Sequence, residues 1–423
     1  MKKIINATKN NKYIKNSLWL IMDKFFLLFG GFVVTAMVAR HLGPEQMGKI
    51  SYGLIFSALC TTVSQWGGSY TVFNTAVSKR GKAVTFIRST LKTRFCIYLF
   101  TWSLSSIYLY NSLVYDDFLI VSLVCLSGIF LGLDIYTFFF NATLKSRINA
   151  KSSMVAKSLT MLLRVGFVIK GLNVHWFILP LVIEGFIIFF LKMKKLKSEE
   201  QLEERNAAYN EYFRSGLVFL GSGLMVFLYA QINRIVLKEY VSFEDLGIYS
   251  VGLALAGAWT FIPMSIGISF LTKALASQKI EDYSFTYFLV LAVSIPVILF
   301  VFIFKKTIIV LTFGEGYLEI APVLPYMCIT ALFTVYGFLN NRHIGSMDRG
   351  GRYLQIKVFV IAIISFPLTI YLVSIYGLFG AVFSILIVEL FSFTMANYFK
   401  SNAIIFRIQL KVFSFETIKK SIS

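Results

Sequence analysis

Long apolar runs separated by short polar stretches fill most of the chain. A helix needs about 20 mostly apolar residues to cross the hydrocarbon core of a membrane. The runs lack the strict alternation that membrane-spanning strands require. The pattern therefore predicts an all-α membrane protein with twelve transmembrane helices, at roughly 17–39, 50–72, 95–113, 118–140, 153–169, 177–191, 215–237, 247–270, 283–304, 321–341, 355–373 and 377–397.

One short stretch occurs twice, half a chain apart. Residues 43–54 read GPEQMGKISYGL, and residues 242–253 read SFEDLGIYSVGL. Six predicted spans separate the two copies, and an even number gives both copies the same orientation in the membrane. The repeat therefore predicts two six-helix bundles related by a pseudo-two-fold axis along the membrane normal, as in transporters that rock two bundles about a central site.

The repeat divides the chain into an N-terminal bundle (1–191), a cytoplasmic linker (192–214), a C-terminal bundle (215–397) and a cytoplasmic tail (398–423). Each copy has the residues that start a helix. Pro44 suits a first helical turn, and Ser242 is placed to cap the next helix. The two copies share two glycine pairs, Gly48 with Gly247 and Gly53 with Gly252. These glycines, Gly48 and Gly247 above all, predict close contact between helices.

Basic residues define the orientation. With the N-terminus inside, the inner segments hold 31 Lys and Arg and the outer loops hold six. Cytoplasmic loops carry such an excess, so both termini are predicted to be cytoplasmic. The net charge of +20 then follows from anchors beside an anionic leaflet, and nucleic-acid binding is not expected.

Composition agrees with this class. The chain is 57% hydrophobic and only 15% charged, whereas soluble domains carry about 25% charged residues. The four cysteines lack the spacing of a metal site, and the three histidines are scattered. No nucleotide-binding GxxxxGK[ST] motif occurs. The sequence thus predicts no metal and no other cofactor, and it argues against an ATPase.

Four stretches resemble a known family. They are NSLWLIMDK (16–24), ARHLGPEQMGKISYG (39–53), FFFNATLKSRINAKS (138–152) and QINRIVLKEYVSFEDLGIYS (231–250). They are similar to Wzx-type polysaccharide (O-antigen) flippases, in the polysaccharide transporter family of the multidrug/oligosaccharidyl-lipid/polysaccharide exporter (MOP) superfamily. This resemblance implies a MATE-like fold.

The resemblance also implies a function in lipopolysaccharide biosynthesis. A flippase of this kind moves undecaprenyl-pyrophosphate-linked oligosaccharide across the bacterial inner membrane, among membrane lipids and beside a polysaccharide polymerase and a chain-length regulator. Two alternatives stay open: a multidrug antiporter of the same fold, and a membrane glycosyltransferase or O-antigen polymerase. The enzymes are disfavoured because they usually have a large outer loop, whereas the longest outer loop here, 305–320, is half apolar.

Ionisable groups inside the spans are costly, so each is a candidate for function. Cations at different depths would suit the passage of a pyrophosphate. The predicted substrate-binding residues are Lys24, Gln65, Arg164, Asn233 and Arg234. The predicted ion-coupling residues are Asp23 and Asp134.

Plainer roles compete with these. Arg234 and Lys157 can extend toward the membrane surface as anchors. Asp134 can form a buried structural ion pair with Lys24 or Lys157. Glu389 is interpreted as a packing or anchoring residue. Trp66, beside Gln65, is a further candidate for stacking on a sugar.

Overall fold

The computed structural model describes residues 12–197, 205–412 and 414, with side chains described for residues 30–196, 209–412 and 414. All regular elements in these ranges are helices. The chain forms two compact units, 1–227 and 228–423, and the division falls inside one long helix, α11 (Arg205–Tyr240). This division lies later in the chain than the linker expected at 192–214.

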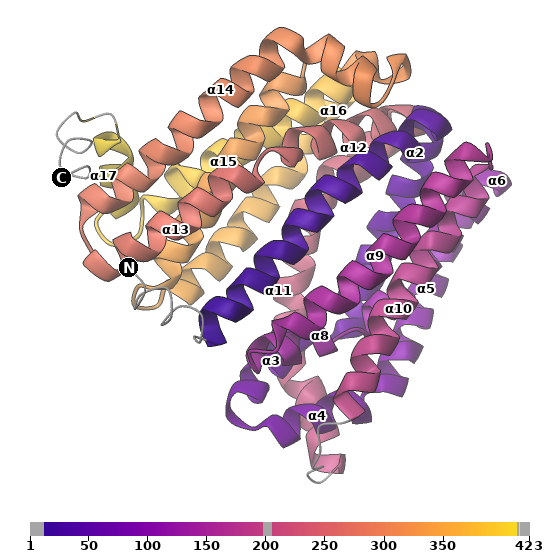
Figure 1. The fold of residues 1–423 in the computed structure, drawn as a ribbon, viewed down its shortest axis with the longest axis horizontal. Helices are drawn as coiled ribbons and strands as arrows, with labels where there is room; N and C mark the ends of the chain where they lie inside the picture. Colours follow the sequence, from indigo (N-terminus) through magenta and orange to yellow (C-terminus); the bar gives the residue numbers. More distant parts are fainter. Residues whose placement is uncertain (1–11, 198–204, 413, 415–423) are drawn as a thin grey trace, which may run out of the picture. The chain divides into compact units, whose positions relative to one another are not determined.

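The described residues of unit 1 form ten helical elements before α11: α2 (Lys12–Gln65), α3 (Gly68–Ser78), α4 (Arg80–Ser89), α5 (Leu91–Ser112), α6 (Tyr115–Ser127), α7 (Ile129–Leu133), α8 (Tyr136–Ala142), α9 (Ser146–Ile169), η1 (Val174–Phe177) and α10 (Ile178–Lys197). The short helices α3, α4 and α8 lie at one end of this unit (Figure 1). Apolar residues of α4 and α8, among them Phe86, Phe139 and Phe140, pack with Tyr212 of α11 in a core cluster.

Unit 2 contains the rest of α11, then α12 (Phe243–Ala258), α13 (Phe261–Ser277), α14 (Ile280–Thr312), η2 (Glu315–Ile320), α15 (Leu324–Gly345), α16 (Gly350–Phe393), η3 (Met395–Asn397) and α17 (Ile404–Lys411). The range 398–423, which the sequence assigns to a cytoplasmic tail, contains α17. Ile405 and Ile408 of α17 are fully buried in the core of unit 2, and Ser284 of α14 donates to the Ile408 carbonyl at 2.9 Å.

Helices coincide with the twelve predicted spans. Six helical stretches of the described residues are long and apolar enough to cross a membrane, and the pair α12–α13, bent by 46°, makes a seventh. Two helices each cover two predicted spans. α2 is interrupted by a non-helical residue at Gly43, and α16 is interrupted at Gly377. The shortest predicted span, 177–191, extends to Lys197 in α10.

The repeated stretch begins a helix in each unit. In unit 1 the backbone leaves the helical region at Gly43, with φ of 78°, and then continues as the second half of α2. In unit 2, Ser242 caps α12 as predicted, because its Oγ accepts from the Asp245 N–H at 3.0 Å. Lys49 in the first copy bridges Glu45 and Asp117 at 2.7 Å each, and although burial opposes its charge, these carboxylates raise the pKa of Lys49.

Equivalent glycines of the two copies stand at equivalent helix contacts. A Cβ at Gly53 would lie 2.6 Å from the Val124 side chain of α6 and 2.8 Å from the Val121 carbonyl oxygen. A Cβ at Gly252 would lie 2.8 Å from Ile320 and from the Met327 sulfur. In both units the repeat thus packs closely against the predicted span two places further along the chain.

We expect Gly53→Ala to destabilise the protein more than Gly252→Ala. The first methyl meets a backbone oxygen, whereas the second meets flexible side-chain atoms that can move. Overpacking of this kind costs about 1–3 kcal/mol. The measurement is the melting temperature of each purified variant in detergent. Gly257→Ala is the control, because a Cβ there meets nothing within 4 Å. Equal melting temperatures for all three variants would contradict the expectation.

Candidate functional site

Two predicted spans of unit 1 are broken near the same end of the bundle. Span 2 is interrupted at Trp66 and Gly67, both with positive φ, between α2 and α3. Span 4 is interrupted at Asp134 and Ile135, between α7 and α8. Each break frees backbone groups from the helical hydrogen-bond ladder. Irregular backbone at membrane depth is tolerated only where protein or water satisfies those groups.

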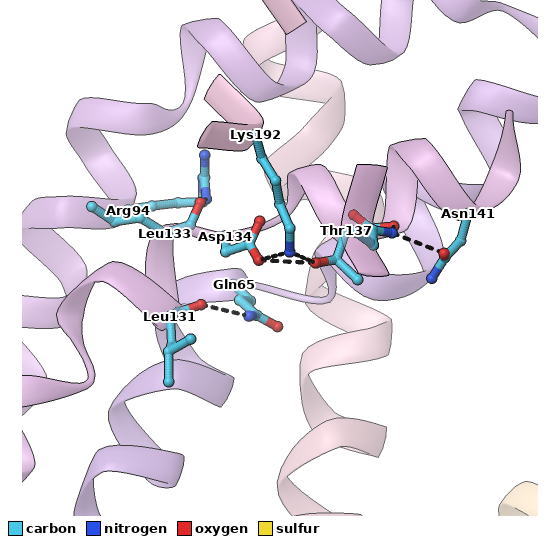
Figure 2. A network of polar contacts seen from close by, with 9 residues as sticks. Gln65, Arg94, Leu131, Leu133, Asp134, Thr137, Asn141 and Lys192 are labelled. Carbon is cyan, nitrogen blue, oxygen red and sulfur yellow. Dashed lines mark hydrogen bonds and ion pairs between the residues drawn. The ribbon is translucent and has the colours of Figure 1, made fainter. Parts of the chain in front are cut away.

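Side chains from other helices bind the freed carbonyls. The Tyr212 hydroxyl of α11 donates to the Gln65 carbonyl at 2.5 Å. Gln65 in turn donates its side-chain amide to the Leu131 carbonyl at 3.2 Å, as Figure 2 shows. Arg94 of α5 donates to the Leu133 carbonyl at 2.8 Å. The two breaks are therefore joined by polar contacts into one site.

Asp134, at the break of span 4, forms a buried ion pair with Lys192 of α10. The Lys192 Nζ lies 2.6 Å from Asp134 Oδ2 and 2.6 Å from the Thr137 hydroxyl, and that hydroxyl donates to Oδ2 at 2.9 Å (Figure 2). The side chains of Asp134 and Lys192 are 7% and 3% exposed. The other carboxylate oxygen, Oδ1, is buried and has no hydrogen-bond partner in the described part of the chain. The carboxylate thus keeps an acceptor that no described group uses.

Arg94 is a second buried cation at this site. Its guanidinium is fully buried and donates to three oxygens: Thr90 Oγ1, the Ile87 carbonyl and the Leu133 carbonyl. No carboxylate of the described residues lies within ion-pair distance of it. The cluster formed by Arg94, Lys192 and Asp134 therefore carries one more positive than negative charge.

The partner of Asp134 differs from the prediction. The sequence suggested Lys24 or Lys157, whereas the ion pair in the structure is with Lys192. Lys192 was assigned to a cytoplasmic linker because it is the first charge after an apolar run. α10 instead continues past Lys192 to Lys197, and the Lys192 side chain is buried inside the bundle. The sequence did offer one signal for an inward-facing Lys192: it lies eight residues after Glu184, so both residues stand on the same face of the helix.

Arg164 and Glu184 form another pair inside unit 1. Arg164 of α9 lies 3.4 Å from Glu184 of α10, and both side chains are 21% exposed. Thr160 also donates to this carboxylate, at 3.5 Å. Along α10 the pair is about 12 Å from Lys192, at 1.5 Å rise per residue. The structure thus gives the predicted residue Arg164 a carboxylate partner and places it apart from the Asp134 cluster.

Asn233 and Arg234, also predicted to bind substrate, lie in unit 2 on α11. The Asn233 side-chain oxygen accepts from Thr369, at 3.3 Å, and from Ser384, which ties α11 to α16. Arg234 is near Gln231, with 3.4 Å between Nη1 and Oε1, and its buried Nε has no partner in the described residues. Asn233 is therefore engaged in packing, whereas Arg234 keeps a free donor.

Unit 2 also contains two buried charged residues for which the sequence predicted no binding role. Lys357 was not a candidate, and Glu389 was interpreted as a packing or anchoring residue. Lys357 of α16 is 5% exposed and donates to the amide oxygens of Asn341 and Asn397. Glu389 accepts a short hydrogen bond from the Tyr229 hydroxyl. Lys357 stands at the start of a span, where the charge pattern alone indicates an inner anchor. Its burial could not be inferred from that pattern.

The side chains of Asp23 and Lys24 lie outside the described residues, so the structure neither supports nor opposes their predicted roles. The described part of the chain contains no group of three or more His, Cys, Asp or Glu that could hold a metal ion.

Solved structures with similar folds define the class of protein. "Lipid II flippase MurJ, inward closed conformation" has a TM-score of 0.73 at 12% identity, covering 96% of this chain and 92% of the other. A multidrug resistance MATE family transporter of the MOP superfamily, inward-facing, has 0.62 at 13% identity, covering 92% and 96%. A MOP superfamily transporter from Pyrococcus furiosus has 0.56 at 11% identity, covering 94% and 95%. The chain shares its all-helical fold with these proteins, which confirms the predicted MATE-like fold class.

The family is shown by a second comparison. The family described as "Polysaccharide biosynthesis protein" matches residues 37–322, more than half of the chain. The protein therefore belongs to this polysaccharide biosynthesis family. A search of curated protein sequences found no match. The solved structures that share the fold are a flippase and transporters, and the family is described as one of polysaccharide biosynthesis.

Proposed function

We propose that the protein is a flippase that moves undecaprenyl-pyrophosphate-linked oligosaccharide repeat units across the bacterial inner membrane by alternating access, with both termini in the cytoplasm. The family match points to polysaccharide biosynthesis, and the fold is shared with a lipid II flippase. The Wzx-like sequence stretches point to O-antigen units as the class of cargo.

The observation that carries the proposal is an excess of cations within the helical bundles. Arg94, Arg234 and Lys357 have no carboxylate of the described residues within ion-pair distance. A cation inside a membrane protein is expensive unless it is paired or serves a function. A bundle that holds more cations than carboxylates is suited to an anionic group, and a pyrophosphate is such a group.

The cations stand at different positions along the predicted path. Lys24 and Arg94 belong to the cytoplasmic side of the predicted topology, and Arg164 and Arg234 lie toward its outer side. In this proposal Lys24 meets the pyrophosphate first, and Arg164 and Arg234 bind it later. Arg164 must then exchange its partner Glu184 for the pyrophosphate.

Asp134 is the proposed coupling residue. Protonation of the Asp134 Oδ1 atom, or a sodium ion bound to it, would weaken the ion pair between Asp134 and Lys192. The released ammonium would then be available to the cargo. Asp23 is a second candidate for the same role.

A multidrug antiporter of the same fold is the second candidate, favoured by the likeness to MATE transporters. Its cationic cargo would need unpaired carboxylates. Asp134 and Glu184 each have a basic partner, and Glu389 is bound by Tyr229. This charge pattern favours the flippase.

Complementation separates the two functions. The protein is expressed in strains that lack their own flippase and differ in their O-antigen repeat unit, and surface polysaccharide is scored. Restoration in at least one strain is the expected result. Increased resistance to cationic drugs without restored polysaccharide would establish the antiporter instead.

We expect Arg234→Gln to reduce export at least tenfold while the protein still accumulates in the membrane. The arginine has no carboxylate partner among the described residues, so its removal leaves no uncompensated charge and the fold should persist. Surface polysaccharide and the amount of membrane-inserted protein are measured together. Arg407→Gln on the exposed face of α17 makes the same change in charge and should retain export. Wild-type export by Arg234→Gln would remove Arg234 from the proposed path.

A further inference from the structure

A pocket of about 240 Å³ opens in unit 1 beside the break of span 2. The end of α2, the start of α3 and the middle of α11 surround it. Its polar and aromatic lining residues are Thr62, Gln65, Ser69, Tyr70, Phe219 and Ser222. The break itself creates the space, because the chain turns away from the helix axis at Trp66 and Gly67.

Every residue that lines this pocket is uncharged. Ser69, Tyr70 and Ser222 contribute hydroxyl groups to the lining. Gln65 uses its NH₂ group on the Leu131 carbonyl, which leaves its oxygen as an acceptor. The pocket thus offers donors and acceptors without a charge, in contrast to the cationic cluster around Arg94 and Lys192.

Tyr70 adds an aromatic surface. Its ring stacks on Phe219 of α11, with centroids 4.9 Å apart and planes 16° apart, and the side chain is 52% exposed. One face of the Tyr70 ring therefore packs on protein while other parts of the residue stay accessible. The sequence suggested Trp66 as the aromatic residue for sugar stacking. In the structure its indole N–H donates to the Phe213 carbonyl at 3.0 Å, and its ring packs edge-on against the Phe213 ring.

We propose that this pocket binds one sugar ring of the transported oligosaccharide, with Tyr70 as the stacking surface. A pyranose has hydroxyls around its rim and an apolar C–H face, which match uncharged hydroxyl and amide groups beside an aromatic ring. A phosphate would find no cation here, and a lipid chain would leave these polar groups unsatisfied. The volume is below the roughly 300–1,000 Å³ of pockets for drug-sized ligands, which suits one ring rather than a repeat unit.

This inference rests on the proposed function and adds a sugar-binding subsite to it. The subsite lies in the same unit as the Arg94–Lys192–Asp134 cluster, and its lining residue Gln65 donates to the Leu131 carbonyl, three residues before Asp134. The pyrophosphate and the sugar of one cargo molecule would thus be recognised by separate groups of residues, one cationic and one neutral.

The test compares carriers with and without sugar. Purified protein in nanodiscs is titrated with undecaprenyl pyrophosphate alone and with undecaprenyl pyrophosphate carrying one glucose, galactose, N-acetylglucosamine or N-acetylgalactosamine, and binding is measured by native mass spectrometry. For the wild type, at least one glycosylated carrier is expected to bind about fivefold more tightly than the bare carrier, the scale of one aromatic contact.

Two variants address the pocket directly. Tyr70→Ala removes the stacking ring, and Ser222→Leu fills the space; both should abolish the preference for sugar while leaving the affinity for bare carrier unchanged. Tyr110→Ala is the matched control, because Tyr110 is 62% exposed and also contacts a phenylalanine, Phe118, elsewhere in unit 1. It should keep the preference.

The outcomes separate the two proposals. A wild type that binds neither kind of carrier would overturn the flippase function and this inference with it. A wild type that binds all carriers equally, or pocket variants that keep the preference, would overturn the sugar subsite alone. If Tyr110→Ala loses the preference for glycosylated carrier as fully as Tyr70→Ala does, the effect belongs to exposed aromatic side chains in general. That result would also overturn the subsite.

Discussion

Lys192→Met is expected to be the most damaging substitution at the site. It keeps an unbranched side chain, one heavy atom shorter, and removes the charge that compensates Asp134, whose side chain is 7% exposed. Breaking a buried pair by removing one partner costs about 3–5 kcal/mol, because the remaining charge is left uncompensated. The melting temperature and the monodisperse yield in detergent should both fall strongly.

The double variant Asp134→Asn with Lys192→Met is the decisive comparison. It removes both charges, and replacing a buried pair by neutral groups of similar volume is often neutral or stabilising. We expect the double variant to recover most of the lost stability. A double variant as unstable as Lys192→Met would show that the damage comes from packing and not from the unpaired carboxylate.

The same double variant tests the proposed coupling role. If Asp134 releases Lys192 during transport, the stable double variant should be folded and inactive in complementation. Normal export by a folded double variant would show that the pair is purely structural.

Gly216→Ala is expected to disrupt the contact that holds the break of span 2 against α11. A Cβ at Gly216 would lie 2.2 Å from the Trp66 carbonyl oxygen, so the backbone must move. Gly67 approaches from the other side, with an added Cβ 2.5 Å from the Gly216 carbonyl oxygen. Overpacking costs about 1–3 kcal/mol, and here it must exceed the roughly 1 kcal/mol that alanine gains in a helix.

The matched control is Gly221→Ala, on the same helix. A Cβ there meets nothing within 4 Å, so only the helix propensity changes. Gly216→Ala should lower the melting temperature and Gly221→Ala should leave it unchanged or raise it. A higher melting temperature for both variants would mean that the two backbones do not touch. Sugar preference should also be lost in Gly216→Ala, since the pocket at Tyr70 depends on the same break.

Much of the fold could be predicted from the residue pattern. Apolar runs of spanning length are visible in the chain itself, because the membrane imposes a length and a polarity on each helix regardless of its neighbours. The repeat likewise led to glycines at helix contacts, and Gly53 and Gly252 have such contacts. The capping role of Ser242 was local, and it too was predictable.

The candidate site was predictable only in part. Asp134 and Gln65 stand out as polar residues in apolar runs, and the structure places both at helix breaks. The breaks themselves were not predicted, because span 4 reads as a continuous apolar run with one aspartate. Whether such a run bends depends on side chains from other helices, here Arg94 and Tyr212, that bind the freed carbonyls.

The tertiary structure alone settled which charges meet. Asp134 and Lys192 are 58 residues apart in the chain, and a hydropathy pattern places the lysine at the membrane surface. Arg94 and Lys357 stand at the same kind of position, and both are buried. A sequence shows how apolar each segment is, because that property belongs to the segment itself. It does not show how far a helix is rotated toward its neighbours, and that rotation determines whether a charge near a helix end faces water or pairs inside the bundle.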